Sequence, residues 1–478
     1  MKQDYIFYDI ESTGLNTCFD QVLQFAAIVT DHNLEEKDRI EIQVKHNADV
    51  IPSLGASLTH MIGPKDFCKG MSEYEGVRKI HQLLNTPNCI SIGYNTLGYD
   101  DECLRFAFYR NLLNPYSHQY ANGCYRMDIY PMTLFYYLFA PEVLDHWPKR
   151  NDLISLKLED LSRENQLATG MAHDAMVDVE ATVALARKFH KNQAVWRYLS
   201  DYFIKQQDQM RIASLPDATS GQAPLKYGLL VQGTIGRRDN FIAPVVVLGQ
   251  HQHYRNQTLL MRLDTEGLES TTAGTIEETP WVIRKKIAEP GFLLPPSARF
   301  IEKLSPERLA LMEKNIDWLK DNPALYAQIQ QHYQQAMYPE YEGIDIGTSL
   351  YQQGFMSSED QKASAVFHQA PWPEKAASIE NFSREDLRVL AARIIGRYDA
   401  SLLSGDVQEE FEAHLQKVFH NMPESQPKDF RNRYQYGLCD LEQEMAHFQD
   451  QDLSPEQHLI LSEFKNWVKA QAGQTQTV

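Results

Sequence analysis

The stretch Tyr5-Ile6-Phe7-Tyr8-Asp9-Ile10-Glu11-Ser12-Thr13-Gly14 joins an apolar run to an acidic pair. The run is aromatic and β-branched with no breaker before its final glycine, which predicts a buried strand. Because alternate side chains on a strand point to one face, Asp9 and Glu11 lie together at its end. Two buried carboxylates repel each other unless a hard cation with oxygen ligands offsets their charge. The same pair is frequent on solvated surfaces, so alone it is a weak indication of a metal site.

A second apolar strand, expected over 89–94, leads to another acidic residue, Asp100. A helical pattern over 101–112 begins directly after it. Asp100 therefore lies where a strand passes into a helix, and it is a candidate ligand for the same cation site. The alternative is a helix N-cap, a role that Asp100 or its neighbour Asp101 could fill.

A third acidic position, Asp178, lies in a helix that we expect over 173–191. Apolar residues at helical spacing place Asp178 on or beside the inner face, with His173 near the helix entrance. A lone histidine at such a place is more often a cap or a hydrogen-bonded core residue than a catalyst. Its five-residue offset from an inward aspartate favours another interpretation. A metal ligand on the helix and a mobile imidazole before it can act on one bound water.

Together these positions resemble the DEDDh class of the DnaQ-like 3'-5' exonucleases, with Asp9-x-Glu11 as motif one, 95–100 as motif two and His173-x4-Asp178 as motif three. Shorter segments resemble one branch of that class, the bacterial exodeoxyribonuclease I family: 24–28, 93–95, 108–111 and 172–176. The resemblance continues more loosely through Leu350-Tyr351-x2-Gly354-Phe355 and the C-terminal third.

The resemblance implies a role for each of the five side chains. Asp9, Glu11, Asp100 and Asp178 would hold two Mg²⁺ ions, directly or through water, and His173 would take the proton from the attacking water. Two metal ions about 3.5–4 Å apart activate a nucleophile and stabilise the leaving group, and imidazole, with a pKa near 6.5, suits the transfer of a proton. The implied activity is magnesium-dependent, processive 3'-5' degradation of single-stranded DNA to 5'-mononucleotides in repair and recombination.

Substrate contacts are expected from Glu11, Thr13, Gly14 and Tyr99, since glycine permits close approach of the backbone to the terminal nucleotide. Aromatic residues that either stack on bases or fill the core gather around motif two: Tyr94, Tyr99, Phe108, Tyr109, Tyr116, Tyr120 and Tyr125. His60 is a departure, because related enzymes often place glycine near this position.

Length and patterning predict three domains in the 478 residues. In the first, 1–195, the pattern predicts a mixed sheet with helices on both faces, and the resemblance implies that this is a ribonuclease H-like α/β exonuclease domain. A polar linker or surface loop at 211–224 precedes β-rich runs at 227–231, 241–248 and 258–263. The resemblance makes this second domain, 196–350, an SH3-like β-barrel with flanking helices. The third, 351–478, is helical.

Composition narrows the protein class further. The net charge of -18 opposes nucleic-acid binding, although 225–300 carries nine Lys or Arg against seven Asp or Glu, which fits either a mixed surface or a binding stripe. The six cysteines lack Cys-x2-Cys spacing, which favours free thiols over zinc or disulfides. With no apolar run approaching the roughly 20 residues of a membrane span and no signal peptide, we expect a cytoplasmic protein.

Partners and alternatives complete the expectations. The resemblance implies single-stranded DNA and the C-terminal tail of single-stranded-DNA-binding protein as partners, no membrane, and a monomer. One alternative is an RNA 3'-end-trimming exonuclease of the same class, although such enzymes are usually little more than the nuclease domain. Another is a catalytically silent nucleic-acid-binding scaffold, which retention of all five side chains disfavours.

Overall fold

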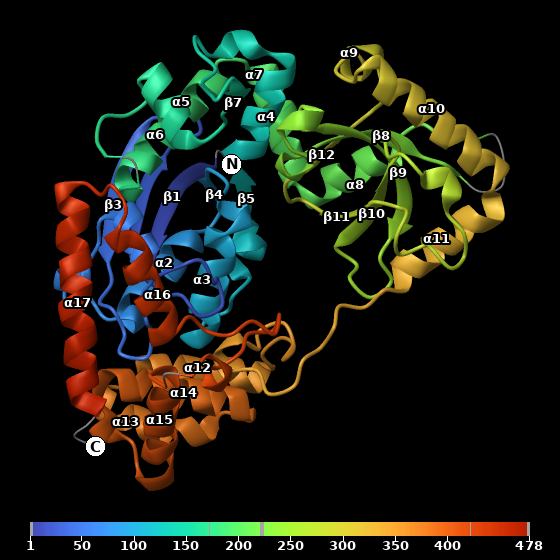
Figure 1. Ribbon diagram of the computed structural model, residues 1–478. Coiled ribbons are helices and arrows are strands. Elements are labelled where there is room, and N and C mark those ends of the chain that lie inside the picture. Colours follow the sequence, from blue (N-terminus) through green and yellow to red (C-terminus); the bar gives the residue numbers. More distant parts are fainter. Residues whose placement is uncertain (1–2, 172, 220–223, 421, 476–478) are drawn as a thin grey trace.

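The computed structural model describes residues 3–171, 173–219, 224–420 and 422–475. Figure 1 shows an α/β part, a curled sheet with helices beside it, and a helical C-terminal part whose last helices return to the first part. The predicted fold class is therefore confirmed. None of the described helices is both long and apolar enough to cross a membrane.

The first part is built on a five-stranded sheet with the order β3-β2-β1-β4-β5. Its strands are β1 (Asp4–Ser12), β2 (Val22–Thr30), β3 (Glu36–Gln43), β4 (Cys89–Gly93) and β5 (Tyr125–Asp128). β1 lies at the centre, antiparallel to β2 and parallel to β4, and Phe7 is in register with Ile28 and Ile92. The expected strands at motifs one and two are confirmed. The alternation of Ile40, Ile42 and Val44 with polar residues also predicts a strand that pairs back on 25–30, and β3 forms this pairing with β2.

The helices of this part are α1 (Leu54–His60), α2 (Glu73–Leu84), α3 (Asp100–Arg110), α4 (Ile129–Phe139), α5 (Leu158–Asn165), α6 (Ala175–His190) and α7 (Gln193–Ser200), while α8 (Lys205–Ala213) packs against the sheet of the second part. A two-strand ribbon, β6 (Lys149–Arg150) and β7 (Leu153–Ile154), precedes α5.

Two helix starts differ from the expectation. The motif-three helix begins at Ala175 and not at His173, because the Asp174 side chain caps it by accepting from the backbone N–H groups of Met176 and Val177. In the second case the sequence pattern predicts a helix over 126–139 with a break at Pro131 and Asp128 as a cap. β5 occupies 125–128 instead, and α4 follows it. Asp128 does cap α4, but the break at Pro131 is absent, since this proline lies in the first turn, where it is tolerated.

The second part is a five-stranded antiparallel sheet that curls into a half-barrel, with the order β11-β10-β9-β8-β12. Its strands are β8 (Tyr227–Val231), β9 (Ile242–Gln250), β10 (Gln257–Arg262), β11 (Val282–Lys286) and β12 (Phe292–Leu294). Three helices follow: α9 (Ala298–Ile301), α10 (Pro306–Asp321) and α11 (Pro323–Gln335). The last two strands were not expected, because β11 is rich in charge and β12 is only three residues long. The expected linker 211–224 lies partly outside the described residues.

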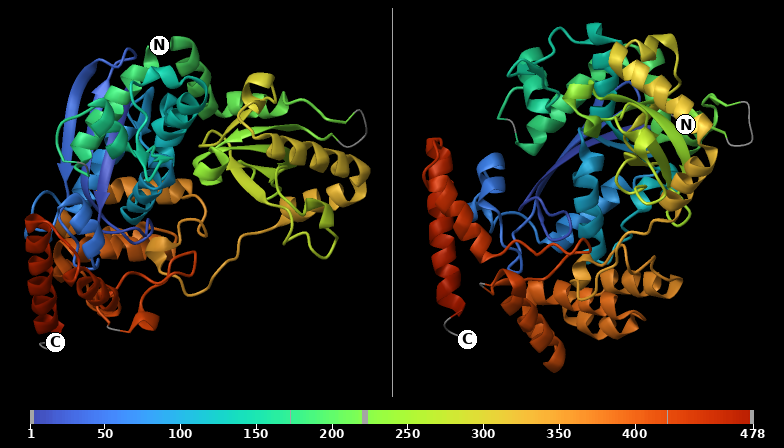
Figure 2. Two further views of the ribbon diagram at one scale, coloured as in Figure 1. Left: turned by 45° about the horizontal axis from the view of Figure 1, so that its top comes forward. Right: turned by 45° about the vertical axis from the view of Figure 1, so that its right-hand side comes forward.

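The C-terminal part consists of α12 (Ser358–Gln369), α13 (Trp372–Lys375), α14 (Glu385–Asp399), α15 (Gly405–Val418), α16 (Leu438–Gln449) and α17 (Pro455–Thr475). It shares its cores with the nuclease part. Phe106 and Tyr109 of α3 pack with Leu387 of α14, while Leu58 of α1 packs with Phe464 of α17. In both views of Figure 2 the C-terminal helices lie against the nuclease part. The exact divisions at 195 and 350 stay a prediction. All six cysteines are free.

Candidate metal centre and its surroundings

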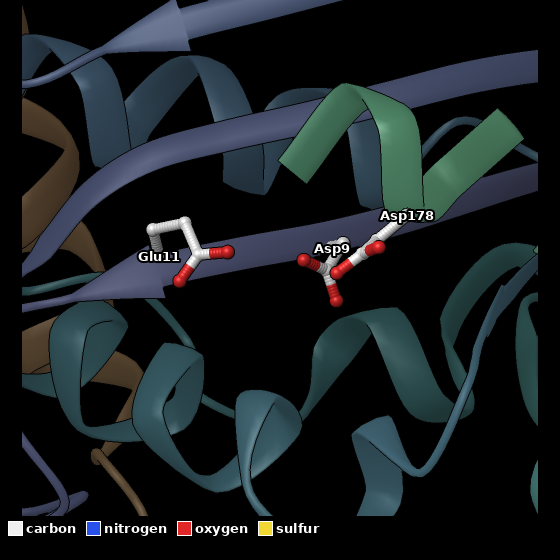
Figure 3. Close-up of side chains that lie close together, drawn as sticks. All are labelled: Asp9, Glu11 and Asp178. Carbon is white, nitrogen blue, oxygen red and sulfur yellow. The ribbon is translucent and has the colours of Figure 1, made fainter. Parts of the chain in front are cut away.

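Three carboxylates meet where β1 faces α6. Asp9 and Glu11 come from alternate positions of β1, and Asp178 comes from the first turn of α6 (Figure 3). Each offers one oxygen, and these oxygens all lie within 4.8 Å of one another. Strand alternation thus places Asp9 and Glu11 on one face, and the Asp174 cap places Asp178 by fixing where α6 begins.

Asp100 lies beside this group, at the start of α3, and is buried. Its carboxylate raises the pKa of Asp9 and of Glu11, although it is not one of the three that lie within 4.8 Å of one another. The N-cap alternative is wrong for both Asp100 and Asp101, because Tyr99 occupies the cap position. We call Asp9, Glu11, Asp100 and Asp178 the acidic cluster.

Burial and mutual repulsion dominate the electrostatics of the acidic cluster. Burial, followed by the charges of Asp100, Glu11 and Asp178, raises the pKa of Asp9 well above its ordinary value. Burial is also the largest cause for Asp100, whose pKa rises to about 8, and for Asp178, whose pKa rises to about 6. Ionising all four therefore needs a compensating positive charge. Carboxylate oxygens are the ligands that Mg²⁺ takes, so the residues present fit a divalent cation.

His173 stands before α6 in a left-handed conformation, with φ 65°. Its side chain is 44% exposed, and its Nε2 lies 3.5 Å from Oε2 of Glu159 on α5. Burial raises the pKa of Asp178, and the nearby His173 partly offsets this rise. The imidazole is thus close to the acidic cluster and partly exposed to solvent.

Two of the expected substrate contacts, Thr13 and Gly14, lie in the turn after β1, and a third, Tyr99, contacts this turn from the start of α3. The Thr13 hydroxyl donates to Oδ1 of Asp20 at 2.7 Å. The Tyr99 hydroxyl donates to the carbonyl of Gly14 and lies 2.7 Å from the Ser12 hydroxyl. A Cβ on Gly14 would lie 2.8 Å from both Asp20 carboxylate oxygens, so a larger residue would displace this carboxylate. These side chains shape the turn, and their contact with substrate stays a prediction.

His60, the last residue of α1, contacts the end of β1 just before the same turn. It is buried, and its Nε2 lies 3.1 Å from the carbonyl oxygen of Ser12, while its Nδ1 accepts from the N–H of Ile62 at 3.1 Å. The accepting Nδ1 leaves Nε2 as the protonated nitrogen that donates to Ser12. This residue therefore ties the loop after α1 to the end of β1.

Two residues near the site carried no signal that the sequence patterns could use. Leu15, directly after Gly14, has a side chain 87% exposed. Glu159 lies 14 positions before His173 and is brought to it only by the packing of α5 on α6.

The basic stretch of the half-barrel is partly neutralised by ion pairs. Lys285 pairs with Asp208 in a fully buried contact, and Arg262 pairs with Asp239 and Asp264. Other cations of the stretch stay exposed: Arg237, Arg238, Arg255, Arg284 and Lys286. The result is a mixed surface with a smaller set of exposed cations, of which Lys286 pairs with Glu289 at 3.7 Å.

A central mixed sheet with a carboxylate cluster at β1, together with a curled antiparallel sheet and a helical part, defines a multidomain protein of the DnaQ-like exonuclease class. Residues 6–186 match the family described as Exonuclease, and residues 344–471 match the family described as Exonuclease I C-terminal domain. The chain belongs to the exodeoxyribonuclease I family, so the resemblance drawn from the motifs is confirmed.

Individual relatives agree. The chain is 34% identical over 276 residues to exodeoxyribonuclease I of Haemophilus influenzae, which covers 56% of this chain and 55% of the relative, so the match spans about half of that protein. It is 28% identical over 386 residues to the Escherichia coli enzyme, covering 76% and 79%. The crystal structure of E. coli exonuclease I in complex with a dA16 oligonucleotide has the same fold, with a TM-score of 0.83, 23% identity and coverage of 98% and 99%.

Proposed function

We propose that this protein is a magnesium-dependent 3'-5' exonuclease that processively degrades single-stranded DNA to 5'-mononucleotides and acts in DNA repair and recombination. The observation that carries the proposal is the meeting of Asp9, Glu11 and Asp178 within 4.8 Å, with Asp100 beside them. The family membership supports the same activity. The cytoplasm is the compartment that we propose.

The acidic cluster would hold two Mg²⁺ ions. When bound, the ions lower the pKa of a coordinated water and stabilise charge on the phosphoryl oxygens and the leaving group. The half-exposed imidazole of His173 then accepts the proton of the attacking water. The 3'-hydroxyl of the shortened strand leaves, and a nucleoside 5'-monophosphate is released. The turn at Thr13 and Gly14 offers its backbone to the terminal nucleotide.

The rest of the strand needs a surface that accepts any base. A cavity of about 350 Å³ lies where the C-terminal end of α3 meets the C-terminal part. Its lining includes Tyr116, Tyr120 and Phe355, of which Tyr120 is 63% and Phe355 80% exposed. Exposed aromatic rings suit sequence-independent stacking. Since α3 is 11 residues long, the cavity lies about 15 Å along the helix from Asp100. We propose that it takes bases upstream of the 3' end.

For partners we propose single-stranded DNA and the C-terminal tail of single-stranded-DNA-binding protein, with the enzyme itself a monomer. One solved structure with this fold is described as single-stranded-DNA-binding protein and exonuclease I in complex with an inhibitor. No residues of this chain are assigned to the tail.

The test is digestion of 5'-labelled single-stranded DNA and RNA, with Mg²⁺ or with chelator, by the wild type and by Asp178→Ala. We expect Mg²⁺-dependent shortening of DNA from the 3' end, which the substitution abolishes. Equal degradation of RNA would favour the RNA-trimming alternative. Activity that survives Asp178→Ala, or no activity in the wild type, would overturn the proposal.

A further inference from the structure

Three consecutive carboxylates at the start of α3 face three different parts of the molecule. Asp100 belongs to the acidic cluster. Asp101 is buried among arginine side chains, and Glu102 accepts hydrogen bonds from Tyr351 and Arg431 of the C-terminal part. Only Asp100 has a part in the proposed chemistry. The other two carboxylates fix the helical turn that carries it.

The side chain of Asp101 is 0% exposed. Its Oδ2 accepts from Nε of Arg105 at 2.8 Å and from Nη1 of Arg126 at 2.5 Å, and its Oδ1 lies 3.0 Å from Nε2 of His118. Charge-assisted hydrogen bonds of this kind are short and directional. A buried carboxylate held on both oxygens cannot turn unless one of these bonds breaks, and breaking a buried ion pair is costly.

Arg126 carries this network out of the nuclease part. It lies on β5, the edge strand of the sheet, and its second terminal nitrogen, Nη2, is 3.2 Å from Oε1 of Glu289. Glu289 lies between β11 and β12 of the half-barrel. One guanidinium group therefore joins Glu289 of the half-barrel to Asp101, the direct neighbour of Asp100.

The turn that presents Glu289 is itself rigidly held. The Nζ of Lys285 is 2.7 Å from Oδ2 of Asp208 on α8, and both side chains are 0% exposed. The same oxygen accepts from the backbone N–H of Ala288 at 2.9 Å, and Lys285 also donates to the carbonyl of Glu289 at 3.4 Å. A fully buried charged pair resists separation, so Glu289 is fixed relative to the half-barrel.

We propose that Glu289 is a positioning residue for the acidic cluster: through Arg126 and Asp101 it sets the first turn of α3, and hence the place of Asp100 beside Asp9 and Glu11. The inference rests on the proposed function. It makes the docked half-barrel a requirement for a well-formed metal centre, beyond any contact of that part with DNA.

The deciding measurement is Mn²⁺ binding to the full-length protein by calorimetry, without DNA. Glu289→Gln keeps the shape of the side chain and removes its charge, and Glu302→Gln, an exposed acid of the same part, is the matched control. Outer partners of metal ligands affect affinity by about 10- to 100-fold. Because Glu289 acts through two further residues, we expect Mn²⁺ affinity to fall by about three- to tenfold, with no change in the control.

Kinetics separate positioning from general support of the fold. On a short oligonucleotide, Glu289→Gln should lower kcat by a similar factor and leave KM unchanged, and Glu289→Asp should recover part of the loss. In an Arg126→Gln background, Glu289→Gln should have no further effect on Mn²⁺ affinity, since the path is already broken. Circular dichroism confirms that each variant folds.

Two results would overturn the positioning role. One is a Glu289→Gln variant that binds Mn²⁺ as the wild type does, and the other is additive losses in the double variant. A wild type that binds Mn²⁺ but does not shorten DNA would instead overturn the proposed function, while the affinities would still decide the role of Glu289.

Discussion

Nε2 of His173 lies 3.5 Å from Oε2 of Glu159, so the residue that we assign as general base is paired with a carboxylate outside the acidic cluster. The pair holds the imidazole at the entrance of α6. Because the His173 side chain is 44% exposed, the pair opens at little cost when substrate arrives.

From this pair we predict that the two residues have unequal effects. His173→Asn should lower kcat by at least about 100-fold, the usual contribution of a general base, and should leave Mn²⁺ affinity within about twofold. Glu159→Gln should lower kcat by no more than about fivefold, because an exposed ion pair contributes little. Single-turnover rates on single-stranded DNA provide the measurement. Equal losses in the two variants would contradict the minor role that we give to Glu159.

The acidic cluster should also be a source of instability in the metal-free protein. Burial raises the pKa of Asp178 to about 6, so its ionised form is disfavoured in the folded state and its contribution to stability falls as pH rises through that value. Asp178→Asn should therefore stabilise the metal-free protein at pH 8 by about 2 kcal/mol. This gain should appear as a rise of a few degrees in the melting temperature.

The same variant should lose the rise in melting temperature that Mg²⁺ gives to the wild type. Asp38→Asn, on the exposed face of β3, is the control and should change neither quantity. A destabilised Asp178→Asn protein would show that the carboxylate is held by favourable contacts and not by repulsion.

His60 should give the folded protein a dependence on acidic pH. Burial lowers the pKa of His60 to about 4, whereas an unfolded histidine titrates near 6.5. The unfolded state therefore binds more protons between these values. The contribution of His60 is fully present above about pH 6.5 and is lost as pH falls towards 4, by about 2 kcal/mol at pH 5.

Denaturant unfolding at pH 7 and pH 5 measures this contribution. His60→Gln, which can still donate to the carbonyl of Ser12, should show a smaller loss of stability between the two pH values than the wild type does. An identical loss in both proteins would mean that other groups are responsible.

The aromatic cavity at the end of α3 should affect binding and not chemistry. Phe355→Ala removes an exposed ring that contacts Tyr116 with centroids 5.6 Å apart. Stacking on one base contributes about 1–3 kcal/mol, so KM for long single-stranded DNA should rise at least about fivefold with kcat unchanged. Leu459→Ala, an exposed apolar residue of α17, is the control. An unchanged KM would place the DNA elsewhere.

Local patterns were sufficient wherever a residue's place depends on its own neighbours in the chain. Strand alternation predicted that Asp9 and Glu11 share a face, and helical spacing predicted that Asp178 lies near the inner face of its helix. Local rules failed where a cap or a charge decides the element. The Asp174 cap starts α6 at Ala175, two residues after the predicted start, and the sequence pattern did not predict the charged strand β11.

The sequence by itself determined the class of site, because Asp9, Glu11, Asp100 and Asp178 lie on a strand and on helices whose periodicity is set by the backbone. Only the tertiary structure decided what surrounds them. It turned Tyr99 and Thr13 into supports of the turn after β1, paired His173 with Glu159, and joined Asp101 through Arg126 to Glu289. His173 and Glu159 lie 14 positions apart in the sequence, and Arg126 and Glu289 lie 163 positions apart. Burial strengthens charged contacts, and it exists only once the chain has folded.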